Sequence, residues 1–168
     1  MADLIAVVGD SGSGKSTSLR NLDPKSTFII NVAGKPLPIK GWKKNYKALV
    51  QDANKKWVGN LYKTSDVAKI STILKMINVQ RPEIKVIIIE DAQYIMAFEA
   101  MERASEKGYE KFTQMASNFY SVLKESANLR EDLKVCVLTH SENTGDALNP
   151  HLKMKTIGKM IDTMNIPK

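Results

Sequence analysis

The chain has 168 residues, of which 43% are hydrophobic and 26% are charged. These proportions are typical of a folded globular domain and exclude an intrinsically disordered chain. The length suits one domain with one core, which we expect to span residues 1–168. The longest apolar runs are far too short to span a bilayer, and no basic stretch precedes the first of them as in a signal peptide. We therefore expect a cytoplasmic location.

The net charge of +7 is concentrated in one part of the chain. Residues 35–63 contain eight lysines and a single acid, Asp52, so this basic segment carries the whole excess. Cys136 is the only cysteine and lies inside an apolar run. It cannot form an internal disulfide, which fits a reducing compartment.

Short apolar runs alternate with amphipathic segments along the chain. Buried strands are predicted at residues 4–8, 27–32, 84–89 and 135–138. Helices are predicted at residues 15–22, from 64 or 65 to 81, 93–107 and 112–129. Residues 33–63 carry glycine and proline without a steady period and predict a loop. Residues 141–168 predict a polar, turn-rich segment that is weakly helical at 156–164. This order favours a parallel α/β sheet.

The stretch GDSGSGKST follows the first predicted strand and opens the first predicted helix. It matches the phosphate-binding pattern G-x-x-x-x-G-K-[ST], which a chance glycine-rich turn in this context would rarely do. Backbone N–H groups and the helix N-terminus face the phosphates, Lys15 supplies a cation, and the Ser16 hydroxyl binds Mg²⁺. The predicted nucleotide-binding residues are Gly9, Asp10, Ser11, Gly12, Ser13, Gly14, Lys15, Ser16 and Thr17.

Two acids, Glu90 and Asp91, follow the third predicted strand. An acid at this place commonly holds Mg²⁺ through water, and a neighbouring acid can polarise the attacking water. Successive strand residues point to opposite faces, so the two acids share a site only if the strand ends between them. We expect Glu90 near the magnesium and Asp91 near the attacking water or facing a neighbouring subunit. In the alternative interpretation, Asp91 caps the following helix.

The stretch VLTHSE ends the fourth predicted strand. In such a sheet this strand lies between two others: the strand before the phosphate-binding loop (the P-loop), and the strand that ends at Glu90 (the acid strand). Thr139 or His140 would then face the γ-phosphate. The alternative is a polar strand end that meets solvent. Four strands are clear, whereas P-loop motors of this kind usually have five. The fifth is therefore expected beyond Lys168; in the alternative interpretation, the chain is a minimal member with four strands.

Three classes of P-loop protein compete. Small GTPases need an N-K-x-D motif, and NKKW at Asn54 lacks its aspartate, which excludes this class. Kinases close arginine-rich lids over the phosphates, and this chain has four scattered arginines. ATP-driven motors and recombination ATPases insert a strand between the P-loop strand and the acid strand, as residues 27–32 do here.

The segments GDSGSGKST, NVAGKPLPIKGW, IIIEDAQYIMAFEAMERASEKGYEKFTQMA, VLTHSE and KMKTIGKMID together resemble one family. It comprises phage-encoded RecA-like AAA ATPases that accompany single-strand annealing proteins in recombination, the Sak-type group. The resemblance implies an α/β P-loop NTPase with a RecA/AAA-like sheet flanked by helices, ATP and Mg²⁺ as ligands, and contact with single-stranded DNA. It also implies rings or filaments and, as a partner, a single-strand annealing or single-strand binding protein. Glu90 departs from the aspartate expected at its position.

The resemblance gives two basic groups a role. Lys153, Lys155 and Lys159 are candidates for a cation that reaches the γ-phosphate of an adjacent subunit; the alternative is a solvated basic tail. In the basic segment, lysines would follow a phosphate backbone while aromatic rings stack on unpaired bases. Its candidate DNA contacts are Trp42, Lys43, Lys44, Tyr46, Lys47, Lys55, Lys56 and Trp57. The alternative is that the rings anchor the segment to the core and the lysines are solvated.

The leading hypothesis is thus an ATPase coupled to single-stranded DNA in phage recombination or replication. Lys15, Glu90, Asp91 and His140 are its candidate catalytic residues, and Ser16 and Glu90 its candidate metal ligands. A small-molecule or nucleotide kinase is the second hypothesis. The third hypothesis is a non-hydrolysing adaptor whose assembly or partner binding responds to ATP. It is retained because position 90 is a glutamate and not the expected aspartate.

Overall fold

A computed structural model of the chain describes residues 1–145, 149 and 151–157. Its strands are β1 (Asp3–Gly9), β2 (Thr27–Asn31), β3 (Val50–Gln51), β4 (Trp57–Val58), β5 (Leu61–Lys63), β6 (Val86–Glu90), β7 (Lys134–Asn143) and β8 (Leu152–Met154). Its helices are α1 (Lys15–Ser18), the 3₁₀ turn η1 (Leu19–Asn21), α2 (Trp42–Asn45), α3 (Val67–Gln80), α4 (Gln93–Glu102) and α5 (Glu110–Ala127). No described helix is both long and apolar enough to cross a membrane.

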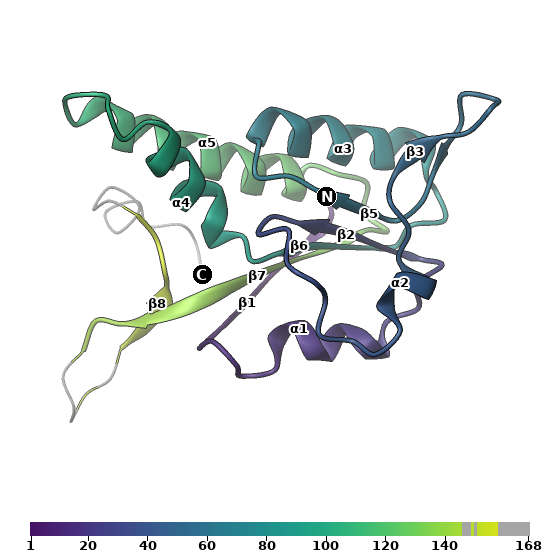
Figure 1. Ribbon diagram of the computed structural model, residues 1–168, viewed down its shortest axis with the longest axis horizontal. Helices are drawn as coiled ribbons and strands as arrows, with labels where there is room; N and C mark the ends of the chain where they lie inside the picture. The colour runs from purple at the N-terminus through teal and green to yellow at the C-terminus, as the bar shows by residue number, and fades with distance from the viewer. Residues whose placement is uncertain (146–148, 150, 158–168) are drawn as a thin grey trace.

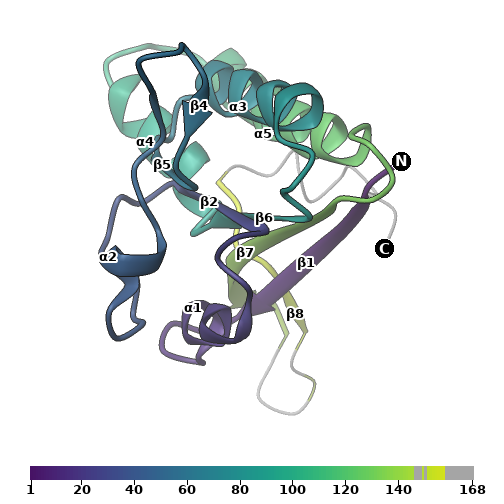
Figure 2. The same ribbon diagram turned by 90° about the vertical axis from the view of Figure 1, so that its right-hand side faces the viewer.

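The central sheet has five parallel strands in the order β1-β7-β6-β2-β5, and β8 pairs antiparallel with the far end of β7. Helices α3, α4 and α5 cover one face, and α1 lies against the other (Figure 1). The turned view shows the same two layers on either side of the strands (Figure 2). The predicted α/β P-loop NTPase fold is therefore confirmed, and β7 lies between β1 and β6 as expected.

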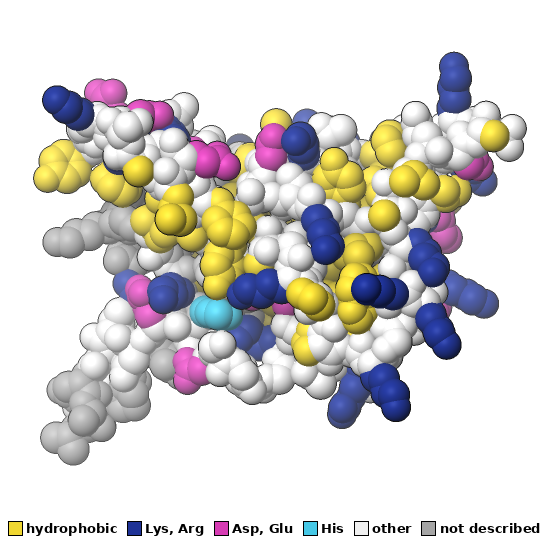
Figure 3. Space-filling view, viewed as in Figure 1, with side chains coloured by type: hydrophobic (Ala, Val, Ile, Leu, Met, Phe, Trp, Pro, Cys, Tyr) yellow, Lys and Arg dark blue, Asp and Glu magenta, His cyan; other side chains and the backbone are white. Residues whose placement is uncertain are grey.

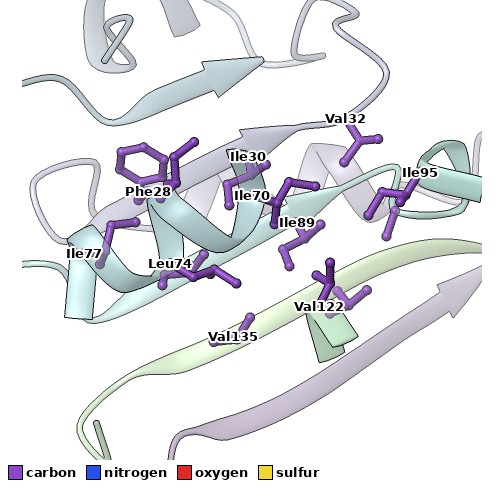
Figure 4. Packing of buried hydrophobic residues seen from close by; sticks show 14 of the residues in the cluster. Phe28, Ile30, Val32, Ile70, Leu74, Ile77, Ile89, Ile95, Val122 and Val135 are labelled. Carbon is purple, nitrogen blue, oxygen red and sulfur yellow. The ribbon is translucent and has the colours of Figure 1, made fainter. Parts of the chain in front are cut away.

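Alternate residues of β2, β6 and β7 supply the two cores. Strand β1, predicted as buried, is instead an edge strand, and Leu4, Ile5 and Val8 on it are exposed. On β6, Ile87 and Ile89 face α3 to α5, whereas Ile88 faces α1 and contacts the cluster around Leu19. The larger core, on the α3 to α5 side, is closed by side chains such as Phe28 and Leu74 (Figure 4). Because both faces of β2 and β6 are covered, β2 is apolar between Thr27 and Asn31 and β6 is apolar up to Glu90, as buried parallel strands usually are.

Residues 33–63, predicted as a loop, contain more regular structure than expected. They form α2, the antiparallel hairpin β3–β4 and the parallel edge strand β5 beside β2. The fifth strand was expected beyond Lys168, but among the described residues the fifth parallel strand is β5. Its three residues are too few to show a period, and buried Asn60 positions it. The Asn60 side chain accepts from Lys47 N at 2.8 Å and donates to Pro24 O at 2.8 Å.

Smaller corrections concern the ends of elements. The first predicted helix divides into α1 and η1, and α4 ends at Glu102, five residues before the predicted end. Strand β7 runs on to Asn143, because backbone pairing with β8 continues the strand after its apolar residues end. Residues 141–143 are therefore strand, not turn. Most of the weakly helical stretch predicted at 156–164 lies outside the described residues.

Candidate functional site: a phosphate-binding pocket

The P-loop joins β1 to α1 in the conformation that its glycines permit. Gly14, the N-cap of α1, has φ 92°, a value that other residues rarely adopt. The Lys15 ammonium lies back over the loop and donates to Gly9 O at 2.6 Å and to Asp10 O at 2.8 Å. These two carbonyls hold the cation beside the pocket.

Ser16 and Glu90 meet at the base of this pocket. The Ser16 hydroxyl donates to Glu90 Oε1, and the other carboxylate oxygen, Oε2, is buried without a hydrogen-bond partner. Burial is the main cause that raises the pKa of Glu90, and the Ser16 hydrogen bond opposes this rise.

The donors at Ser16 and Glu90 fit a magnesium ion. A hydroxyl and a carboxylate are the hard oxygen ligands that Mg²⁺ prefers, and the ion usually completes its shell with phosphates and water. Across the described residues, no three acidic, histidine or cysteine side chains gather as a metal site.

Asp91 shares the pocket with Glu90 because β6 ends between them. Asp91 has φ 60°, a left-handed backbone that turns its side chain toward the same cavity. Its Oδ2 lies 3.6 Å from Lys35 Nζ and its Oδ1 lies 3.6 Å from His140 Nε2. The N-cap of α4 is Ala92, with no side-chain hydrogen bond, so Asp91 does not cap the helix.

His140, and not Thr139, faces the pocket. Thr139 is fully buried, and its hydroxyl has no hydrogen-bond partner. The His140 ring lies edge-on to Tyr94, with ring centres 6.4 Å apart. Burial and the charge of Lys15 lower the pKa of His140, although Asp91 opposes this, so the imidazole is neutral near pH 7.

The pocket has a volume of about 290 Å³. Its lining combines the P-loop, the ends of β2 and β6, one residue of β7, and a loop after β2: Ser11, Gly12, Gly14, Lys15, Ser16, Thr17, Asn31, Lys35, Pro36, Leu37, Pro38, Glu90, Asp91 and His140. The sequence analysis missed the contribution of Asn31 and of residues 35–38. The usable signal was a polar residue at the end of a buried strand, followed by glycine and two prolines.

The AAA domain family matches residues 2–134, from the residue before β1 to the first residue of β7. The chain belongs to the AAA domain family. No curated protein matches it. In this AAA domain, the matched region contains the P-loop and both acids of β6, whereas His140 lies beyond it. The family membership agrees with the nucleotide-binding chemistry of the pocket.

The candidate DNA contacts of this AAA domain differ in exposure. The exposed side chains are all lysines: Lys43, Lys44, Lys47, Lys55 and Lys56. Lysine and arginine side chains gather on the side of the molecule that carries α2 and the β3–β4 hairpin (Figure 3). Trp42 and Trp57 are half-buried against opposite cores, and Tyr46 is only 3% exposed. Tyr46 therefore cannot stack on a base in this conformation and serves as an anchor.

Of the basic residues near the end of the chain that the structure describes, Lys153 lies in β8 and Lys155 directly after it. Lys153 Nζ is 3.2 Å from Glu142 Oε1 on the paired strand. Lys155 is exposed, and its backbone N–H donates to His140 O at 2.8 Å. Lys159 lies outside the described residues.

Proposed function

We propose that this AAA domain protein binds ATP with Mg²⁺ and hydrolyses it while bound to single-stranded DNA, in phage recombination or replication. The observation that carries the proposal is the meeting of Lys15, Ser16, Glu90, Asp91 and His140 around one pocket. Lys15 and Ser16 stand at the positions that bind phosphate and metal in P-loop proteins. Asp91 brings a carboxylate to the same cavity, and His140 brings a neutral imidazole.

Each residue has a distinct task in this proposal. Lys15 exchanges the carbonyls of Gly9 and Asp10 for phosphate oxygens. Ser16 and Glu90 hold the metal, which neutralises phosphate charge when bound. Asp91 accepts a hydrogen bond from the attacking water, and neutral His140 orients that water or the γ-phosphate.

The DNA part of the proposal rests on charge and exposure. The five exposed lysines among the candidate contacts belong to α2, to the residues that follow it and to the β3–β4 turn. Lysine and arginine side chains gather on that side of the molecule (Figure 3). The five lysines suit the phosphate backbone of a single strand, with the exposed parts of Trp42 and Trp57 left for base stacking. A single-strand annealing or binding protein is the partner that this activity would serve, and a ring or filament is the assembly that would place several such segments along one strand.

The deciding experiment measures ADP release by the whole protein at low salt, with and without single-stranded DNA. We expect stimulation by DNA, and loss of turnover in Lys15→Ala but not in Lys25→Ala, whose lysine is exposed and outside the pocket. Phosphate transfer to a nucleoside or nucleotide instead of water would indicate a kinase. A nucleotide-dependent change in assembly without turnover would indicate an adaptor. Either result would replace the proposal.

A further inference from the structure

A second ammonium group, that of Lys35, lines the phosphate pocket. Its Nζ donates to Tyr94 Oη at 3.2 Å, lies 4.6 Å from the centre of the Tyr94 ring, and lies 3.6 Å from Asp91 Oδ2. More than half of its side chain is still exposed, so the group can move. The same charge acts on Glu90 and on His140, whose pKa values both respond to Lys35 as well as to Lys15. The Lys15 and Lys35 ammonium groups therefore both act on the same pocket.

The loop that carries Lys35 is held in place from both sides. Asn31, buried at the end of β2, donates to Lys35 O at 2.6 Å and accepts from Gly34 N at 2.8 Å. Lys63 Nζ on β5 donates to Gly34 O at 3.1 Å. Leu37, which stands between two prolines in the sequence, is only 4% exposed and packs into the smaller core.

These anchors fix the backbone at position 35, while more than half of the Lys35 side chain stays exposed beside Tyr94 and Asp91. An ordinary solvated lysine would not need such a loop. The built backbone, the partly exposed ammonium and the shared pocket point to a ligand of high negative charge at that position.

We propose that Lys35 is a second phosphate-binding cation of the pocket, supplied by the same chain, which contacts the terminal phosphate of a nucleoside triphosphate. This inference rests on the proposed function. Without ligand, Asp91 and Tyr94 hold the ammonium; with a triphosphate, the ammonium transfers from Asp91 to the phosphate. Asp91 then loses its cation and becomes a better acceptor for the attacking water.

The proposal predicts that Lys35 raises the affinity for a nucleoside triphosphate and leaves the affinity for a diphosphate nearly unchanged. Equilibrium binding of Mg²⁺ with ADP, and with a slowly hydrolysed ATP analogue, is measured for the whole protein. In Lys35→Met, which keeps an unbranched apolar stem over Tyr94, the analogue binds about tenfold more weakly, the scale of one charge-assisted hydrogen bond. ADP affinity stays within about twofold. Lys35→Arg restores most of the preference.

Lys40→Met is the matched control, because Lys40 is an exposed lysine of the same segment that does not line the pocket. It should leave both affinities unchanged. A second measurement needs no variant: the rate at which an amine-directed acylating reagent modifies Lys35 in the wild-type protein is read by peptide mass spectrometry. The ATP analogue should protect Lys35 about fivefold more than ADP does, and should not protect Lys40.

The outcomes separate this inference from the proposed function. A wild-type protein that prefers the triphosphate, with that preference intact in Lys35→Met and no protection of Lys35, overturns the role of Lys35 alone. Loss of the preference in Lys35→Met, in a protein whose turnover ignores DNA, supports Lys35 and contradicts the proposed function. Wild-type protein that binds neither nucleotide contradicts both.

Discussion

The Ser16 hydroxyl donates a hydrogen bond to Glu90 Oε1 and so joins the first turn of α1 to the end of β6. The second carboxylate oxygen of Glu90 is buried and lacks a hydrogen-bond partner. The pair thus presents two oxygen ligands to the pocket while leaving a carboxylate poorly solvated. Burial raises the pKa of Glu90 for this reason. The feature that suits a metal ion is therefore one that costs stability when no ion is bound.

We expect Glu90→Gln to stabilise the nucleotide-free protein at pH 7 and to abolish Mg²⁺-dependent hydrolysis. A carboxyl whose folded-state pKa lies above its ordinary value of 4.5 contributes stability below pH 4.5, and that contribution is lost as the pH rises through the folded-state value. The glutamine amide does not ionise, so Glu90→Gln does not lose stability in this way as the pH rises. A gain of about 1 kcal/mol would raise Tm by roughly 2–4 °C, as thermal unfolding would show.

Glu102→Gln is the control for this variant, because Glu102 is exposed and outside the pocket. Its Tm should match that of the wild-type protein at pH 7. A Glu90→Gln protein that is less stable than wild type at pH 7 would show that the carboxylate is well satisfied without metal, against our interpretation of the Ser16–Glu90 pair.

A second prediction concerns the imidazole of His140. Burial lowers its pKa from the ordinary value of 6.5, so the fold favours the neutral ring. A depressed pKa contributes stability above pH 6.5 that is lost as the pH falls through the folded-state value. His140→Gln should therefore lose less stability than wild type between pH 7.5 and 5.5 in urea unfolding. Equal pH dependence of the two proteins would mean that the fold does not lower the pKa of His140.

The basic segment gives a third prediction, for binding of single-stranded DNA. Reversing two exposed charges, in Lys43→Glu with Lys44→Glu, should weaken binding and flatten its dependence on salt. Each phosphate contact to a single strand contributes about 0.7 to the slope of log affinity against log salt, so two lost contacts remove about 1.4. Fluorescence anisotropy of a labelled oligonucleotide across a salt series gives this slope.

Tyr46→Phe is the comparison that tests whether the Tyr46 hydroxyl stays buried when DNA binds. The Tyr46 hydroxyl is buried and has no hydrogen-bond partner, so its removal should leave both DNA binding and stability unchanged or slightly improved. Weaker DNA binding by Tyr46→Phe would mean that this part of the segment opens in the complex. A salt slope unchanged by the two charge reversals would instead exclude Lys43 and Lys44 from the DNA surface.

The parts of the fold predicted from sequence are those whose chemistry is local. The P-loop follows from its own nine residues, and the long helix α5 from its apolar period. Buried parallel strands show as continuous apolar runs, which is why β2 and β6 were predicted nearly residue by residue. The place of β7 between β1 and β6 followed from the P-loop architecture.

The parts that sequence reasoning missed depend on contacts between distant residues. Strand β5 has three residues, and its position is set by the bonds of Asn60 to two other loops. The shared orientation of Glu90 and Asp91 depends on one backbone angle at the strand end. Lys35 was counted as one of eight basic residues because nothing near it in the sequence shows that Asn31 turns it toward the pocket.

The last prediction tests how strictly the loop before β5 is built. Gly59 has φ 95°, and a Cβ atom there would lie 2.2 Å from Ala48 O and 2.9 Å from Lys47 O. Gly108 has nearly the same angle, φ 93°, but open space around it. Gly108→Ala should cost about 1–2 kcal/mol for the left-handed backbone alone. Gly59→Ala adds a clash with main-chain atoms and should cost clearly more in urea unfolding. Equal costs would mean that the chain at residues 47–48 yields easily, and that β5 is less firmly held than its contacts indicate.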